Sequence, residues 1–192
     1  MKKIVIINGH PNPSSFNFAI AQSYLNGAIE SKALVETITI AELQFNPNLK
    51  FGYTKRIELE PDLLESWEKI KRADHLVWIH PIWWGGLPAI TKGFIDRLFL
   101  PGMAFQHREN SVWWDKLLKG KTAHIITTLD QPSWYYRLFY ARPSVNQLKK
   151  TVLEFCGIKP VKVSYIGIIK TADEKQREKW LKKVFDFGFR NK

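Results

Sequence analysis

The chain has 192 residues, of which 45% are hydrophobic and 24% charged, and its formal net charge is +11. This length and composition predict a single globular domain over residues 1–192, with a core that needs no metal or disulfide. The single cysteine, Cys156, excludes an intramolecular disulfide and any metal site built from several cysteines. We therefore expect a reducing, cytoplasmic location. A strand pattern begins at Lys3, which leaves no room for a signal peptide, and no apolar run is long enough to span a membrane.

The positive charge leaves two interpretations open. Lysine and arginine can neutralise the phosphates of a nucleic acid, but here they are scattered along the chain. Stretches such as EKQREKWLKK (residues 174–183) are typical of solvated helix faces with mixed signs. No zinc-finger spacing, basic zipper or aromatic RNA-binding signature accompanies them. A field that attracts an anionic cofactor explains the charge equally well, so nucleic-acid binding is the less favoured alternative.

Hydrophobic residues alternate between strand-like and helix-like periods. Apolar and β-branched runs predict five strands, at Lys3–Asn8, Leu34–Ile40, His75–His80, Thr122–Thr128 and Val161–Ile169. Apolar residues at helical spacing predict helices over Phe16–Ala28, from Pro61, from Pro88, over Ser144–Phe155 and from Ala172. Repeated alternation of this kind predicts an α/β fold with a parallel sheet and helices on both faces. Such sheets bind ligands beyond the carboxyl ends of their strands, so the loops 9–15, 81–87 and 129–143 are the candidate site.

The first loop, NGHPNPSSFNFA (residues 8–19), has neither a dinucleotide fingerprint nor a P-loop. Instead Ser14 and Ser15 fall at the start of a helix, where free N–H groups and the helix dipole favour an anion. Asn17 and His10 can add hydrogen-bond donors from either side. This pattern predicts a phosphate site, although Ser15 could equally be a plain N-cap with Asn17 facing solvent.

The second loop places Trp83 and Trp84 between a proline and two glycines, in HPIWWGGLPAITKGF (residues 80–94). Aromatic side chains offer stacking area to a planar heterocycle, and the backbone at Gly85 can approach such a ring closely. The alternative is that the two tryptophans fill the core or a subunit contact. Adjacent residues in an extended loop cannot both point the same way.

The stretches HPNPSSFNFA and PIWWGGLPAITKGFIDRLF together resemble the flavodoxin-like NAD(P)H:quinone oxidoreductases, which include the modulator of drug activity B proteins. The resemblance runs from the first strand to the last helix. It implies a three-layer sandwich around a five-stranded parallel sheet of order 2-1-3-4-5. It also implies that the flavin phosphate is bound by His10, Ser14, Ser15, Phe16 and Asn17. The isoalloxazine ring is then held by Pro81, Ile82, Trp83, Trp84 and Gly85, with Trp84 bordering the open face of the flavin.

The third loop departs from the family pattern. Relatives commonly carry Thr-Thr-Gly-Gly here, whereas this chain has TTLDQPSWYY, so that Thr127 and Thr128 match but Leu129 and Asp130 replace the glycines. All four positions are carried over as flavin contacts, with a changed geometry at the pyrimidine edge. A negative charge at Asp130 would oppose an anionic reduced flavin unless the side chain turns away. A catalytic tyrosine of mammalian relatives falls at Tyr135, while their accompanying histidine is replaced by Ala141.

The resemblance implies an enzyme in which bound FMN or FAD takes a hydride from NAD(P)H and passes it to a quinone, nitro or azo compound. Because the cofactor carries this chemistry, no metal is expected. Relatives of this type form homodimers, and Phe105, Trp113 and Trp114 are candidate interface or pocket walls, or else core residues. Three alternatives stay open: a one-electron flavodoxin, although such carriers are generally acidic; a flavin-binding regulatory subunit of a membrane transporter; and a basic nucleic-acid-binding protein.

Overall fold

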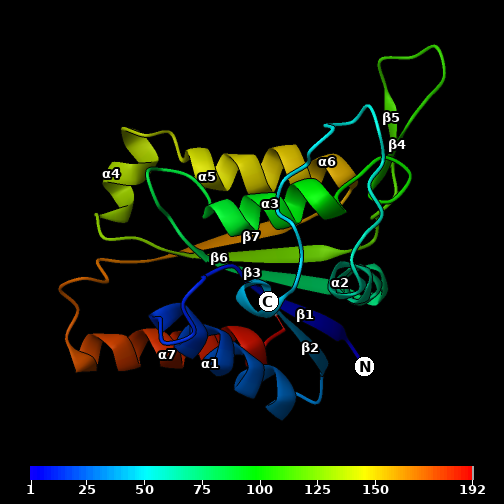
Figure 1. Ribbon diagram of the computed structural model, residues 1–192. Coiled ribbons are helices and arrows are strands. Elements are labelled where there is room, and N and C mark those ends of the chain that lie inside the picture. Colours follow the sequence, from blue (N-terminus) through cyan, green and yellow to red (C-terminus); the bar gives the residue numbers. More distant parts are fainter. Residues whose placement is uncertain (192) are drawn as a thin grey trace.

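A five-stranded parallel sheet forms the centre of the protein (Figure 1). The structure is a computed structural model and describes residues 1–191. The sheet has the order β2-β1-β3-β6-β7. Its strands are β1 (Lys3–Asn8), β2 (Leu34–Thr39), β3 (His75–Pro81), β6 (Thr122–Thr128) and β7 (Val161–Ile166). Counting only these strands, the order is the 2-1-3-4-5 that the resemblance implies, and the flavodoxin-like fold is confirmed.

Helices cover both faces of the sheet (Figure 1). One face carries α1 (Phe16–Glu30) and α7 (Glu174–Phe189). The other face carries α2 (Pro61–Arg72), α3 (Ala89–Leu98), α5 (Pro143–Asn146), the π-helical η2 (Gln147–Leu153) and α6 (Glu154–Cys156). Because alternate side chains of a strand point to opposite faces, β1 sends Ile4 and Ile6 toward α1 and α7, and Val5 and Ile7 into the other half of the core.

The predicted boundaries hold to within a few residues, with differences at three places. After β2 the chain forms the short 3-10 helix η1 (Ile40–Glu42), and α7 begins at Glu174, where the Asp173 side chain accepts a hydrogen bond from the Gln176 amide. The last strand stops at Ile166 instead of Ile169. The residues that follow leave the sheet and contact the third loop, where the Ile169 amide donates a hydrogen bond to the carbonyl oxygen of Leu129. No helix in residues 1–191 is long and apolar enough to cross a bilayer.

Besides η1, a hairpin and a short helix were not predicted. The first is an antiparallel hairpin formed by β4 (Phe105–His107) and β5 (Trp114–Lys116), and the second is the short helix α4 (Ser133–Leu138). In Figure 1 the hairpin projects at one end of the molecule and α4 lies at the other. Strands of three residues are too short to show a periodic pattern in the sequence.

A pair of glycines lets α1 and α7 approach closely. A Cβ atom at Gly27 would lie 2.1 Å from the carbonyl oxygen of Phe185, and one at Gly188 would lie 2.1 Å from that of Tyr24. Either side chain would have to push the two backbones apart. The close contact brings the N-terminal half of α7 beside the N-terminus of α1, at the carboxyl edge of the sheet, as Figure 1 shows.

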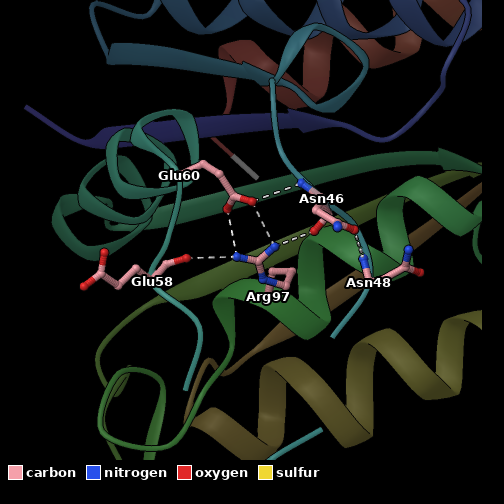
Figure 2. Close-up of polar contacts among 5 residues, drawn as sticks. All are labelled: Asn46, Asn48, Glu58, Glu60 and Arg97. Carbon is pink, nitrogen blue, oxygen red and sulfur yellow. Dashed lines mark hydrogen bonds and ion pairs between the residues drawn. The ribbon is translucent and has the colours of Figure 1, made fainter. Parts of the chain in front are cut away.

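The buried side chain of Arg97 anchors the long connection 43–60 to α3 (Figure 2). The Arg97 side chain is 1% exposed and forms an ion pair with Glu60 at 2.8 Å. Its guanidinium also donates to the carbonyl oxygens of Asn46 and Glu58, and the Asn46 amide donates to the Glu60 carboxylate. Partial burial alone would raise the pKa of Glu60, but the hydrogen bonds from Arg97 and Asn46 outweigh it and hold that pKa below its ordinary value.

Replacing Arg97 by Leu should therefore lower the free energy of unfolding by about 3 kcal/mol, since it removes the charged partner of Glu60 and leaves two carbonyl groups without this donor. The matched control is Arg72→Leu, which removes a similar pair with Glu36 on the exposed surface and should change stability little. Because the pKa of Glu60 is lowered by folding, its contribution is present at neutral pH and is lost as the pH falls through the folded-state pKa. Urea unfolding at pH 7 and at about pH 3 checks both effects. Equal stability of the two variants at neutral pH would contradict this role for Arg97.

Candidate functional site

The three loops singled out in the sequence meet at the carboxyl ends of β1, β3 and β6. The Gly9 amide donates to the carbonyl oxygen of Ile79 at 2.8 Å, and the Ile82 amide donates to that of Thr128 at 2.8 Å. The Thr91 hydroxyl of α3 donates to the Gly9 carbonyl at 2.8 Å. These bonds extend the strand pairing into the loops and hold them side by side.

A cleft of about 250 Å³ lies between these loops and is called the main cleft below. Most of its lining was predicted: His10, Ser15, Phe16, Asn17, Pro81, Ile82, Trp83, Thr128, Leu129 and Asp130. Two further lining residues, Ile169 and Arg177, were not predicted. The main cleft is therefore lined by residues of all three loops and of α7.

Two buried hydrogen-bond donors in the main cleft have no acceptor within residues 1–191: Ser15 Oγ and Asn17 Nδ2. The amide of Asn17 is oriented by the Thr128 hydroxyl, which donates to Asn17 Oδ1 at 2.9 Å and leaves the NH₂ group unused. Buried donors without partners are costly and rare. Both belong to the N-terminus of α1, whose first turn contains no acidic residue and presents free N–H groups. The arrangement fits an anionic ligand with several acceptor oxygens.

His10 lies at the rim of the same group of donors. Its Nδ1 accepts a hydrogen bond from the Asn12 amide at 3.0 Å, so the ring proton is on Nε2. Burial lowers the pKa of His10, which keeps the imidazole neutral at neutral pH. The neighbouring Ser14 is exposed, and its amide donates to Asn12 Oδ1 at 2.9 Å. It is not among the residues that line the main cleft.

The second loop forms a tight turn closed by two hydrogen bonds between Trp83 and Gly86, at 3.1 and 2.8 Å. Its central residues have positive φ angles, 50° at Trp84 and 76° at Gly85, as a type I′ turn requires. A tryptophan in this region of φ is strained, and its ring is fully exposed to solvent. Such strain at an exposed aromatic residue is more common at functional sites than in plain packing.

The two tryptophans line different clefts. Trp83 lines the main cleft, with its ring 5.4 Å from that of His10. Trp84 lines a second cleft, which meets the main cleft at Ile82. The lining of the second cleft carries no charged side chain and consists of Ile82, Trp84, Gly85, Gln131, Tyr140 and Pro143.

Hydrogen bonds to the carbonyl oxygen of Gly85 fix the turn formed by residues 83–86. This oxygen accepts hydrogen bonds from the Tyr136 hydroxyl at 3.2 Å and from the Ser144 amide at 3.0 Å. The Ser144 amide is also 3.0 Å from the Tyr136 hydroxyl. Tyr136 is fully buried, and burial raises the pKa of its phenol, so that it stays a neutral donor.

The two residues that replace the family's glycines are tied to the chain after β7. The main chain of Leu129 exchanges hydrogen bonds with Ile166 and Ile169, and its side chain is buried with Tyr136 and Val145. The Asp130 carboxylate accepts a hydrogen bond from the Lys170 amide at 2.8 Å. This bond turns the carboxylate toward the 166–170 main chain.

Two other predicted residues lie outside both clefts. Thr127 is buried, and its hydroxyl donates to the His80 carbonyl at 3.0 Å. Tyr135 stacks on Phe139 with ring centroids 4.7 Å apart. Neither is among the residues that line the main or the second cleft. Within residues 1–191 there is also no group of three His, Cys, Asp or Glu side chains placed to hold a metal.

Arg177 is the main feature that the sequence did not reveal. Its guanidinium donates to the carbonyl oxygens of Ile169 at 3.1 Å and Ala172 at 3.3 Å, and lies 5.1 Å from the centre of the Phe16 ring. These contacts hold a cation at the wall of the main cleft. Its surroundings in the sequence are typical of a solvated helix face, and only the packing of α7 against α1 sets this arginine apart.

Comparison with known proteins agrees with this geometry. A family described as having a flavodoxin-like fold matches residues 2–185. The chain belongs to this family. It is 30% identical to a protein of Haemophilus influenzae named an uncharacterized NAD(P)H oxidoreductase, over 91% of this chain and 88% of the relative. It is also 25% identical to the rat ribosyldihydronicotinamide dehydrogenase [quinone], over 92% and 86% of the two chains. The resemblance to NAD(P)H:quinone oxidoreductases is thereby confirmed.

Solved structures show the same fold. Smu.1420 from Streptococcus mutans superposes with a TM-score of 0.86 and 36% identity, over 99% of this chain and all of that one (100%). An FMN-dependent NADH-azoreductase from Bacillus anthracis, solved in complex with FMN, gives a TM-score of 0.76 and 20% identity, over 100% of this chain and 99% of that one. The second likeness concerns the fold alone.

Changing both Ser15 and Asn17 to Ala should weaken flavin binding far more than it weakens folding. Hydrogen bonds to a charged group contribute about 1.5–3 kcal/mol each, so the Kd should rise roughly tenfold or more for each donor removed. Flavin fluorescence titration of the apoprotein measures the Kd, and thermal unfolding of the apoprotein measures stability. Ser14→Ala is the matched control, since this neighbouring hydroxyl lies outside the main cleft. Equal flavin affinity of the double variant and the control would remove these donors from the site.

Proposed function

We propose that this protein is a flavin-dependent NAD(P)H oxidoreductase that passes a hydride from NAD(P)H, by way of bound FMN or FAD, to a quinone or a similar small acceptor. The observation that carries the proposal is the pair of buried, unpartnered donors at the N-terminus of α1, Ser15 Oγ and Asn17 Nδ2. They lie in one cleft with Trp83, at the edge of the sheet where doubly wound folds bind nucleotides. Family membership and the NAD(P)H oxidoreductase relative support the same conclusion.

The residues of the main cleft fit a flavin. Ser15, Asn17 and the first amides of α1 would bind the phosphate, with the Nε2–H of His10 as a further donor. Trp83 and the backbone of the 82–85 turn would border the ring system. Arg177 adds a positive charge at the α7 side of the cleft, which suits the phosphates of either FMN or FAD. A bound flavin supplies the hydride chemistry, while the protein orients the reactants.

The second cleft suits a flat, neutral acceptor. Its lining carries no charged side chain, and Trp84 offers an exposed indole on which an aromatic compound can stack. A quinone, a nitro compound or an azo compound has this shape and polarity. No protein nucleophile is required, and burial raises the pKa of Cys156 to about 12, which keeps that thiol protonated.

The protein purified with flavin should oxidise NAD(P)H in the presence of a quinone. Replacing Trp84 by Ala should raise the KM for the acceptor more than it lowers kcat, because stacking area for the substrate is lost while hydride transfer is untouched. Quenching of indole fluorescence by bound flavin should also decrease. The control is Trp134→Ala, an exposed indole outside both clefts. Bound flavin without turnover would identify a regulatory subunit instead, and unaltered kinetics in Trp84→Ala would show that this turn is only packing.

We further propose that the protein forms a homodimer through the β4–β5 hairpin. Trp114 stacks on Phe155 at 4.1 Å and donates from Nε1 to the Phe155 carbonyl, which anchors the base of the hairpin to α6. Phe105 packs on the same ring at 5.0 Å. At the tip, Val112 and Trp113 are 87% and 66% exposed. A braced hairpin with an apolar tip is typical of a subunit contact. Of the three aromatic residues predicted at an interface, Trp113 is the one whose ring is mainly exposed.

Light scattering at micromolar concentration should report a dimer for the wild type, and Trp113→Ser should shift the equilibrium toward monomer because it removes apolar contact area at the centre of the contact. Leu64→Ser, an exposed apolar residue on α2, serves as the control and should leave the dimer intact. A monomeric wild type would contradict the proposed assembly.

We also propose a cellular setting and a domain organisation, each on one observation. The single thiol of the chain, Cys156, is buried and unpaired, which suits a reducing cytoplasmic compartment. The two large core clusters lie on opposite faces of one sheet, which supports the expectation that residues 1–192 act as one domain.

A further inference from the structure

Two side chains of opposite charge line the main cleft, Asp130 in the third loop and Arg177 on α7. A third titratable residue in the lining, His10, is neutral because burial lowers its pKa. Neither Asp130 nor Arg177 forms an ion pair within residues 1–191. A ligand in the main cleft is therefore exposed to two separate charges, one negative and one positive.

Both charges are held in place by the chain that follows β7. The Asp130 carboxylate accepts a hydrogen bond from the Lys170 amide at 2.8 Å. The Arg177 guanidinium donates to the carbonyl oxygens of Ile169 and Ala172, at 3.1 and 3.3 Å. Main-chain amide and carbonyl groups carry no net charge, so these bonds fix the two side chains without neutralising them. The negative charge at Asp130 is therefore a permanent feature of the cleft wall.

The two charges lie beside different parts of the main cleft. The Arg177 guanidinium is 5.1 Å from the centre of the Phe16 ring, at the first residue of α1, and so lies near the phosphate donors. Asp130 lies where the main cleft meets the second cleft, since the next residue, Gln131, lines the second cleft. Ile82, at the start of the 82–85 turn, lines both clefts. The carboxylate is thus on the side of the turn that would border the flavin ring.

These two parts of a flavin differ in how their charge changes during turnover. The phosphate has the same charge whether the ring is oxidised or reduced. Hydride transfer oxidises NAD(P)H to NAD(P)⁺ and adds two electrons and one proton to the ring, which gains one negative charge unless it takes a second proton from solvent. Arg177 therefore attracts both forms about equally. A fixed carboxylate near the ring repels the reduced form more than the oxidised form.

We propose that Asp130 sets the reduction potential of the bound flavin, because its carboxylate disfavours the anionic reduced ring and so lowers that potential. The proposal rests on the proposed function, since it takes the ligand of the main cleft to be a flavin. A lower potential weakens the driving force for hydride transfer from NAD(P)H and strengthens that for transfer to the acceptor. Asp130 is thus a residue that determines which acceptors the protein can reduce.

The test is the midpoint potential of FMN bound to the full-length protein, measured by slow enzymatic reduction against a reference dye, without NAD(P)H. Asp130→Asn removes the charge and keeps an oxygen that can accept from the Lys170 amide. It should bind reduced FMN about tenfold more tightly than wild type and oxidised FMN equally well, which raises the two-electron potential by about 30 mV. The matched control is Glu30→Gln, which removes an exposed carboxylate at the C-terminal end of α1 and should leave the potential unchanged.

A second variant separates the charge of Asp130 from its hydrogen bond. Asp130→Gly loses both and should raise the potential as much as Asp130→Asn does. A shift in the glycine variant alone would assign the effect to the hydrogen bond and overturn the proposal, and so would equal potentials in wild type and both variants.

The same measurements distinguish this proposal from the proposed function. A wild type that binds FMN and shows the expected shift on Asp130→Asn, but does not oxidise NAD(P)H, would support the role of Asp130 and contradict the proposed function. NAD(P)H oxidation with an unshifted potential would overturn the role of Asp130 alone. A wild type that binds no FMN would contradict both.

Discussion

The parallel pairing of β1 with β3 is the constraint on which the site depends. From β1 the chain crosses over one face of the sheet through α1, and from β3 it crosses over the other face through α3. The loops that leave these two neighbouring strands must therefore diverge, and the space between them opens at the carboxyl edge. The hydrogen bond from the Gly9 amide to the Ile79 carbonyl carries the pairing one residue beyond β1 and sets where the divergence begins. The order of the strands and the opposite crossovers of α1 and α3 therefore place the main cleft at this point, whatever side chains line it.

Side chains then decide what the cleft can bind. The chain satisfies most polar groups around it internally, including the Asp130 carboxylate, the Gly85 carbonyl and Asn17 Oδ1. Among the residues that line the main cleft, Ser15 Oγ and Asn17 Nδ2 are the buried polar side-chain atoms left without a partner within residues 1–191. The same third loop that lacks the family's glycines supplies Tyr136, which holds the Trp83–Gly86 turn. The same segment thus braces the turn beside the main cleft through Tyr136 and leaves Trp134 and Phe139 exposed on its other side.

Much of the fold and of the main cleft could be predicted from the sequence, because both depend on local patterns. Continuous apolar runs such as residues 75–80 mark strands buried on both faces, and the order of strands and helices places the loops. Ser15 and Asn17 were recognisable because a helix N-terminus leaves amides free. The role of Arg177 depends instead on two glycines, Gly27 and Gly188, that let distant helices meet. The hairpin at residues 105–116 is too short for periodicity, and the position of Tyr135 outside both clefts results from packing against Phe139.

The central claim is that a flavin phosphate is bound at the N-terminus of α1. A crystal structure of the purified protein with its flavin tests this most directly. We expect phosphate oxygens within about 3 Å of both Ser15 Oγ and Asn17 Nδ2, with the isoalloxazine beside Trp83 and the 82–85 turn. A flavin whose phosphate lies elsewhere, with those two donors still unpartnered or bonded only to water, would contradict it.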